Sequence, residues 1–127
     1  MVRHLKYTFW NKLIIEGTED YIGLWEVIRE IKLSFPHANR QDIKAMTLES
    51  IREILETKFM AIGMFKVIDG NNWEYQIWNL DIDRIINRIE IEWNELEREP
   101  NIGDIAWLIT TKEGEKEANI INKKWKR

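Results

Sequence analysis

Apolar residues recur along most of this chain with the three- and four-residue spacing of amphipathic helices. The spacing predicts three helices in the first half of the chain, over residues 5–16, 20–35 and 39–58. Gly17 and Pro36 follow the first two as helix-stop residues, and Asn39 is a good N-cap for the third. An alternating pattern in residues 5–9 leaves a strand open as the alternative for the first segment.

The pattern changes after the third predicted helix and indicates a β-hairpin. Residues 60–68 are rich in apolar and β-branched side chains, and residues 73–78 have the composition of a return strand. Between them, the tetrapeptide Asp69-Gly70-Asn71-Asn72 is a strong turn signal. We therefore expect an antiparallel hairpin with its turn at these four residues.

The remaining segments predict a helix, a strand and a last helix. Isoleucines recur at helical spacing over residues 81–98, and residues 105–109 form a short apolar run typical of a buried strand. Thr110 and Glu113 have the spacing of a capping box, which predicts the start of the last helix. The predicted fold class is α+β: a helix-rich single domain over residues 1–127, with three N-terminal helices followed by a β-hairpin, then helix, strand and helix.

This predicted order is winged-helix-like. Residues 108–114 also resemble the strand end that precedes the last helix in many winged-helix regulators. The chain further resembles a family of small uncharacterised bacterial proteins in three short segments, residues 21–26, 47–55 and 102–107. That resemblance implies no established activity. The predicted helix over residues 81–98 departs from a simple winged helix, in which the strands on either side of it are consecutive.

The composition excludes several kinds of chemistry. The chain has no cysteine, which rules out disulfides, thiol nucleophiles and cysteine-ligated zinc. His4 and His37, the two histidines, lack a partner at metal-binding spacing and are expected on the surface. No glycine-rich phosphate loop is present, and Ser34 and Ser50 lie outside any nucleophile motif. We therefore expect no catalytic residue, no metal and no cofactor, in a protein that is not an enzyme.

Charge and hydropathy bear on the partner and the compartment. The formal net charge is −3 and the isoelectric point about 5.5, which disfavours nucleic acid because its binding proteins usually carry a basic face. The basic tail over residues 123–127 is expected to stabilise the end of the last helix. No signal-peptide pattern occurs, and no apolar run approaches the ~18 residues of a membrane helix. We expect a cytoplasmic protein with no membrane contact.

Acidic side chains line one face of two predicted helices. At 100° per residue, three glutamates fall opposite the apolar stripe of the third helix, and three acids spaced by seven follow one flank of the fourth. The candidate partner-binding residues are these six acids and one isoleucine: Glu49, Glu53, Glu56, Asp83, Glu90, Ile91 and Glu97. Ile91 points away from the apolar stripe. We expect the last or the first helix to cover it, and an exposed partner anchor is the alternative.

These features predict one function and leave a second open. The first is a non-enzymatic protein-binding module whose acidic helix faces meet a basic protein, in its most concrete form an immunity-type inhibitor of a basic toxin or nuclease. The alternative is a winged-helix DNA-binding transcriptional regulator, in which the third helix enters the major groove. Glutamates on the outer face of that helix would meet phosphates, which favours the first function. The acids also fit an ordinary solvated surface with no partner.

Overall fold

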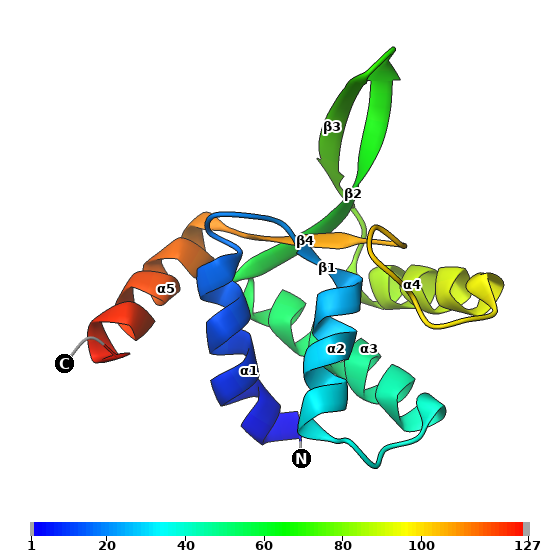
Figure 1. Ribbon diagram of the computed structural model, residues 1–127. Coiled ribbons are helices and arrows are strands. Elements are labelled where there is room, and N and C mark those ends of the chain that lie inside the picture. The colour runs from blue at the N-terminus through cyan, green and yellow to red at the C-terminus, as the bar shows by residue number, and fades with distance from the viewer. Residues whose placement is uncertain (1, 126–127) are drawn as a thin grey trace.

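The computed structural model describes residues 2–125, and the side chains of residues 9–123 (Figure 1). Its elements follow in the order α1 (Val2–Glu16), β1 (Ile22–Gly23), α2 (Leu24–Ser34), α3 (Arg40–Thr57), β2 (Met60–Asp69), β3 (Asn72–Ile77), α4 (Ile82–Leu96), β4 (Trp107–Thr110) and α5 (Lys112–Trp125). The strands form one antiparallel sheet in the order β1-β4-β2-β3. The expected α+β class is thereby confirmed.

The expected run of three consecutive helices is wrong. Strand β1 lies between α1 and α2, where Ile22 pairs with Leu108 and Gly23 pairs with Trp107 of β4. As a result, α2 begins at Leu24, several residues later than the sequence pattern predicts. A two-residue strand is too short to produce a periodic signal of its own. Its conformation depends on a partner near the other end of the chain.

The expected hairpin is confirmed, and it stands away from the helices (Figure 1). Residues 60–63 of β2 pair with β4, whereas residues 63–69 pair only with β3. Gly63 is the junction, because it pairs with both Ile77 and Trp107. Beyond Gly63 the hairpin has no further strand beside it within the described residues, so both of its edges are unpaired there.

The core lies between the first three helices and the sheet. Trp10, Leu24, Ile51, Ile62 and Leu108 are among its largest fully buried side chains, and they come from α1, α2, α3, β2 and β4. Burial of apolar side chains on this scale is the main stabilising contribution in a domain of this size.

Side-chain caps account for the starts of α3, α4 and α5. The side chains of Asn39 and Asp81 accept hydrogen bonds from the third following backbone N–H, at 2.8 Å and 2.9 Å. The expected cap at Thr110 is wrong. Strand β4 includes Thr110, whose buried Oγ1 donates to the carbonyl oxygen of Ile14 at 2.8 Å. Thr111 caps α5 instead, through a 3.1 Å hydrogen bond from Gly114 N.

The close approach of strands at Gly63 gives a test of the sheet junction. A Cβ atom at Gly63 would lie 2.0 Å from the carbonyl oxygen of Gln76 and 2.8 Å from Ile77 Cα, both backbone atoms. We expect Gly63→Ala to lower the free energy of unfolding by about 2 kcal/mol, measured by urea denaturation, since overpacking forces a backbone shift. Gly70→Ala is the matched control, because Gly70 has open space and a φ of +45°. It should cost about 1 kcal/mol from backbone strain alone. Equal unfolding midpoints for wild type and Gly63→Ala would contradict the junction described.

Candidate functional site

The expected acidic face of α3 is only partly exposed. Glu49 and Glu56 are exposed, whereas Glu53 is half-buried. Within the described residues, Glu49 and Glu56 form no ion pair. Two uncompensated carboxylates therefore remain on the outer surface of this helix, and we call Glu49 and Glu56 the α3 ridge.

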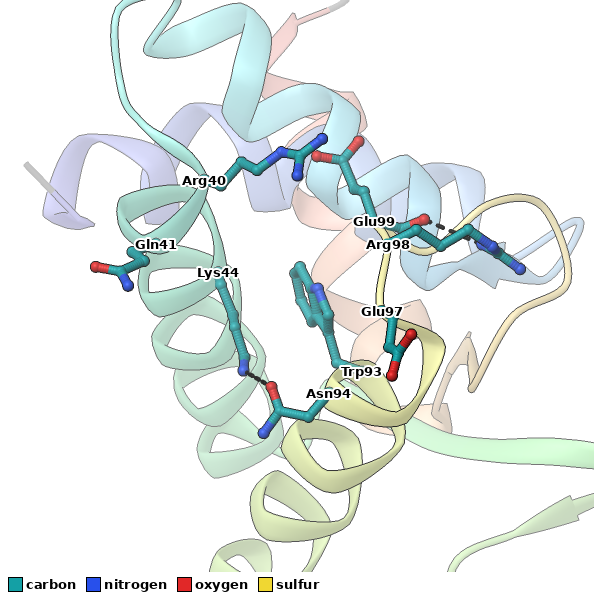
Figure 2. A pocket seen from close by; sticks show the side chains of 8 residues that line it. All are labelled: Arg40, Gln41, Lys44, Trp93, Asn94, Glu97, Arg98 and Glu99. Carbon is teal, nitrogen blue, oxygen red and sulfur yellow. Dashed lines mark hydrogen bonds between the residues drawn. The ribbon is translucent and has the colours of Figure 1, made fainter.

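The acids of α4 were expected to form a free acidic flank, but this flank faces α3 and two of its acids pair with cations there. Asp83 Oδ1 lies 2.7 Å from Nη1 of Arg52, and Glu90 Oε2 lies 3.9 Å from Nζ of Lys44. The Lys44 ammonium also donates to the side chain of Asn94, as Figure 2 shows. Asp83 and Glu90 therefore sit at the seam between the two helices and neutralise two cations of α3.

Glu97, the third acid of this flank, borders a cleft at the end of α4. The cleft has a volume of about 230 Å³, and the side chains of Arg40 and Lys44 line it together with Trp93, whereas the Arg98 guanidinium points away from it (Figure 2). Lys44 Nζ lies 5.9 Å from the centre of the Trp93 ring. Glu97 therefore belongs to a surface of mixed charge, separate from the α3 ridge.

Ile91 is exposed, with 49% of its surface accessible. The expectation that the first or last helix covers it is wrong, because α1 and α5 pack against each other elsewhere in the fold (Figure 1). One turn earlier on α4, Arg88 Nε lies 2.8 Å from Glu92 Oε2, and Arg88 Cζ lies 4.0 Å from the centre of the Trp78 ring. The outer face of α4 therefore combines one exposed isoleucine with locally paired charges.

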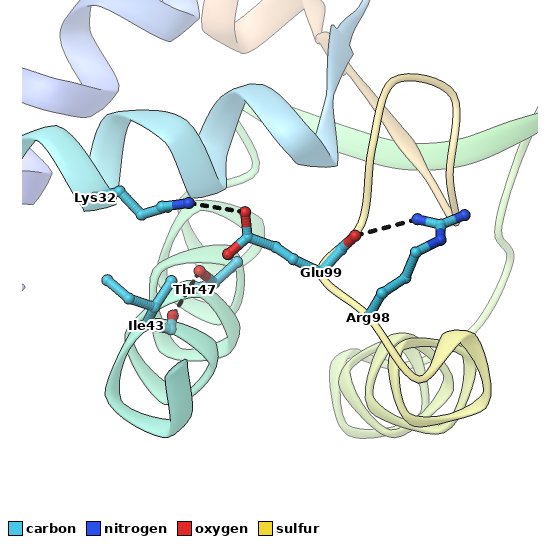
Figure 3. A network of polar contacts seen from close by, with 5 residues as sticks. All are labelled: Lys32, Ile43, Thr47, Arg98 and Glu99. Carbon is cyan, nitrogen blue, oxygen red and sulfur yellow. Dashed lines mark hydrogen bonds and ion pairs between the residues drawn. The ribbon is translucent and has the colours of Figure 1, made fainter. Parts of the chain in front are cut away.

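A polar network holds the loop after α4 against α2 (Figure 3). Lys32 Nζ donates to Glu99 Oε2 at 3.0 Å, and Arg98 Nη1 donates to the Glu99 carbonyl oxygen at 3.1 Å. Arg98 also pairs with Asp104 at 2.7 Å, and the backbone N–H of Asn101 donates to the same Asp104 oxygen. The Arg98 hydrogen bond, followed by that of Asn101, lowers the pKa of Asp104 below its usual value.

The sequence reasoning missed an aromatic cluster at the base of the hairpin. The Tyr21 ring lies 4.8 Å from that of Phe65 and 4.7 Å from that of Tyr75, and the Phe65 ring lies 6.1 Å from that of Trp107. Tyr75 Oη donates to the Trp107 carbonyl oxygen at 2.7 Å, and burial raises the pKa of this phenol above its usual range. The available signal was the strand alternation of the hairpin, which puts Phe65 and Tyr75 on one face.

A hollow of about 540 Å³ opens beside this aromatic cluster. Its lining includes four carboxylates and three aromatic rings, those of Glu16, Glu19, Asp20, Glu26, Tyr21, Trp25 and Trp107. The residues come from the end of α1, the following turn, the start of α2 and β4. We call this surface the acidic hollow. It was not predictable from helical periodicity, because most of its acids lie at or beyond helix ends.

The described part of the chain shows neither a metal-binding cluster nor a membrane-spanning helix. Within residues 2–125, no group of three or more His, Cys, Asp or Glu side chains is placed to hold a metal ion. In the same part of the chain, no helix combines the length and apolar character needed to cross a membrane. His37 is exposed, as expected. His4 and residues 124–127 lie outside the described side chains.

No protein-family model, curated protein or solved structure matches this chain. The resemblance carried by residues 21–26, 47–55 and 102–107 therefore stays a prediction.

The lowered pKa of Asp104 gives a test of the loop after α4. A carboxylate whose pKa is lower in the folded state stabilises the fold above its unfolded pKa, close to 3.8, and loses this effect as pH falls through the folded value. We expect Asp104→Asn to lower the free energy of unfolding by about 0.5–1 kcal/mol at pH 7, discounted for solvent screening. The difference from wild type should shrink below pH 3.8, measured by denaturant unfolding across pH. Glu95→Gln, at an exposed acid of α4, is the control and should show neither effect.

Proposed function

We propose that this protein is a non-enzymatic module that binds a basic protein partner, in the manner of a cytoplasmic immunity-type inhibitor of a cationic toxin or nuclease. The observation that carries the proposal is the charge arrangement of α3. Glu49 and Glu56 are exposed and form no ion pair with any side chain that the structure describes, whereas the Lys44 and Arg52 cations of the same helix pair with acids of α4. The outer surface of α3 is consequently negative.

A negative helix face suits capture of a basic partner for two physical reasons. Complementary charge speeds the diffusional encounter, and it fixes the orientation in which two surfaces meet. The α3 ridge supplies this field, with Glu53 at its margin. Asp83, Glu90 and Glu97 contribute less, since cations of α3 or of the adjoining cleft lie beside them. Ile91 supplies an exposed apolar contact on α4.

A winged-helix DNA-binding regulator is the second candidate, and one observation favours it. The short strand β1, between α1 and α2, joins the sheet from which the β2–β3 hairpin projects. The hairpin follows α3 directly, as it does in winged-helix proteins. Charge argues against it. In such proteins the third helix enters the major groove and faces phosphates. Here its outer face carries Glu49 and Glu56, and the exposed part of the hairpin carries Lys66 against Asp69 and Glu74.

Charge reversal of the α3 ridge tests the leading proposal. The protein, immobilised, is used to recover a basic partner from a lysate of the source cells, and association kinetics are then measured. We expect Glu49→Lys with Glu56→Lys to slow association about five- to tenfold at low salt, and the difference to shrink at high salt as screening increases. The control, Glu113→Lys with Glu115→Lys on α5, carries the same charge change on exposed residues. Equal effects of both variants, or none, would contradict a role for the α3 ridge.

Duplex DNA tests the second candidate. We expect wild type to show no saturable binding to labelled 30-base-pair duplexes below about 10 µM, measured by fluorescence anisotropy, whereas specific DNA-binding proteins reach roughly 10⁻⁸ M. The variant with lysine at positions 49 and 56 should gain weak, salt-sensitive DNA affinity, because its α3 surface becomes positive. Submicromolar binding by wild type that weakens with added salt would favour the regulator over the inhibitor.

A further inference from the structure

We infer that the acidic hollow is the anchor pocket for an arginine or lysine side chain of the basic partner. This inference rests on the proposed function and adds a specific site to it. The hollow has a volume of about 540 Å³, within the range of roughly 300–1,000 Å³ typical of ligand pockets. Its lining includes four carboxylates and no lysine or arginine.

The negative charge of the hollow is uncompensated and held in place. Within the described residues, Glu19, Asp20 and Glu26 form no ion pair. Asp20 Oδ1 accepts a hydrogen bond from the backbone N–H of Tyr21 at 2.8 Å, and Glu26 Oε2 accepts one from Gly23 N at 2.8 Å. These bonds fix two of the four carboxylates before a ligand arrives, which reduces the entropy lost on binding.

Two internal cations lie near the hollow, and neither forms an ion pair with its carboxylates within the described residues. The Arg29 guanidinium lies over the Trp25 ring, with Cζ 5.0 Å from the ring centre. The charge of Glu16 is one of the factors that raise the pKa of Lys12, but the Lys12 ammonium lies 2.5 Å from Glu30. The hydrogen bond to Glu30 is the largest cause of that raised pKa. A cation from outside the chain therefore meets carboxylates that no described side chain neutralises, apart from this distant effect on Glu16.

Aromatic walls make the hollow suited to a long basic side chain. The rings of Trp25 and Trp107 flank Gly23, where an added Cβ would lie 2.6 Å from Trp25 Cδ1 and 3.2 Å from Trp107 Cζ3. Indole faces attract guanidinium and ammonium groups, and the methylene stem of arginine or lysine packs on aromatic surface. Because Arg29 lies over the Trp25 ring, Trp107 is the indole wall left for a cation from outside.

The hollow continues into an apolar surface on the hairpin. Tyr21, which lines the hollow, contacts Phe65 and Tyr75 of the aromatic cluster. Val67 and Trp73 are the next cross-strand pair on that same hairpin face, and they are 44% and 63% exposed. An anchor pocket bordered by exposed aromatic and aliphatic residues is the usual composition of the centre of a protein interface.

A small probe tests the hollow without the partner. N-acetyl-arginine amide is titrated into ¹⁵N-labelled protein, and the indole N–H signals of Trp25 and Trp107 are followed by NMR. We expect saturable shifts of these two signals, weakened at least about fivefold in Glu19→Gln with Asp20→Asn because two nearby charges are lost. Glu49→Gln with Glu56→Gln is the matched control and should leave the affinity unchanged. Unsaturable shifts, or equal affinities of all three proteins, would overturn the inference, as would equal binding of neutral N-acetyl-norleucine amide.

The recovered partner separates failure of this inference from failure of the proposed function. Loss of partner affinity in the Glu19→Gln, Asp20→Asn variant supports the hollow as the anchor. Loss confined to the α3 ridge variants overturns the hollow and leaves the proposed function standing. An acidic partner overturns the proposed function, whereas the arginine titration still decides whether the hollow binds a cationic side chain. Unchanged melting temperatures of the variants, which alter exposed residues, exclude unfolding as the cause.

Discussion

The fold depends on one short strand, β4, which pairs on both of its sides. Leu108 lies opposite Ile22 of β1 and opposite Ile62 of β2, and all three side chains are buried. This pairing attaches the start of α2 to the base of the hairpin. It also brings Trp107 beside Tyr21 and Gly23, so the acidic hollow and the aromatic cluster exist only because β4 joins the sheet at this register.

The segment between β3 and β4 affects the charge that α3 presents to solvent. It contains α4, which packs against α3 and directs Asp83 and Glu90 toward Arg52 and Lys44. These exposed or half-exposed pairs add little to stability, since ion pairs in solvent contribute about 0–1 kcal/mol. Their larger effect is on recognition. They neutralise two of the cations of α3, Lys44 and Arg52, and leave Glu49 and Glu56 as outward charges of this helix.

Elements stabilised by interactions within a few residues could be predicted from the sequence. The turn signal at residues 69–72 and the caps at Asn39 and Asp81 are satisfied within a few residues, so the hairpin, α3 and α4 could be predicted. Strand β1 could not, because two residues become a strand only through β4. Ile105 likewise adopts a φ of 69°, rare for a β-branched residue, and this delays the start of β4 relative to the apolar run.

The candidate site shows the same contrast between features that local sequence determines and features that distant segments create. Helical geometry was sufficient to place Glu49 and Glu56 on the outside of α3, but the ion pairs of α4 and the acidic hollow depend on contacts between distant segments.

The long sequence separation between β1 and β4 affects how the protein folds during synthesis on the ribosome. Synthesis proceeds from the N-terminus, and domains generally fold as units once their contacts are available. Ile22 and Gly23 are made long before their pairing partners Leu108 and Trp107. Helices α1 to α3 can form while translation continues, but the sheet closes only after β4 has been made. The nascent chain therefore exposes part of its future core until β4 has left the exit tunnel.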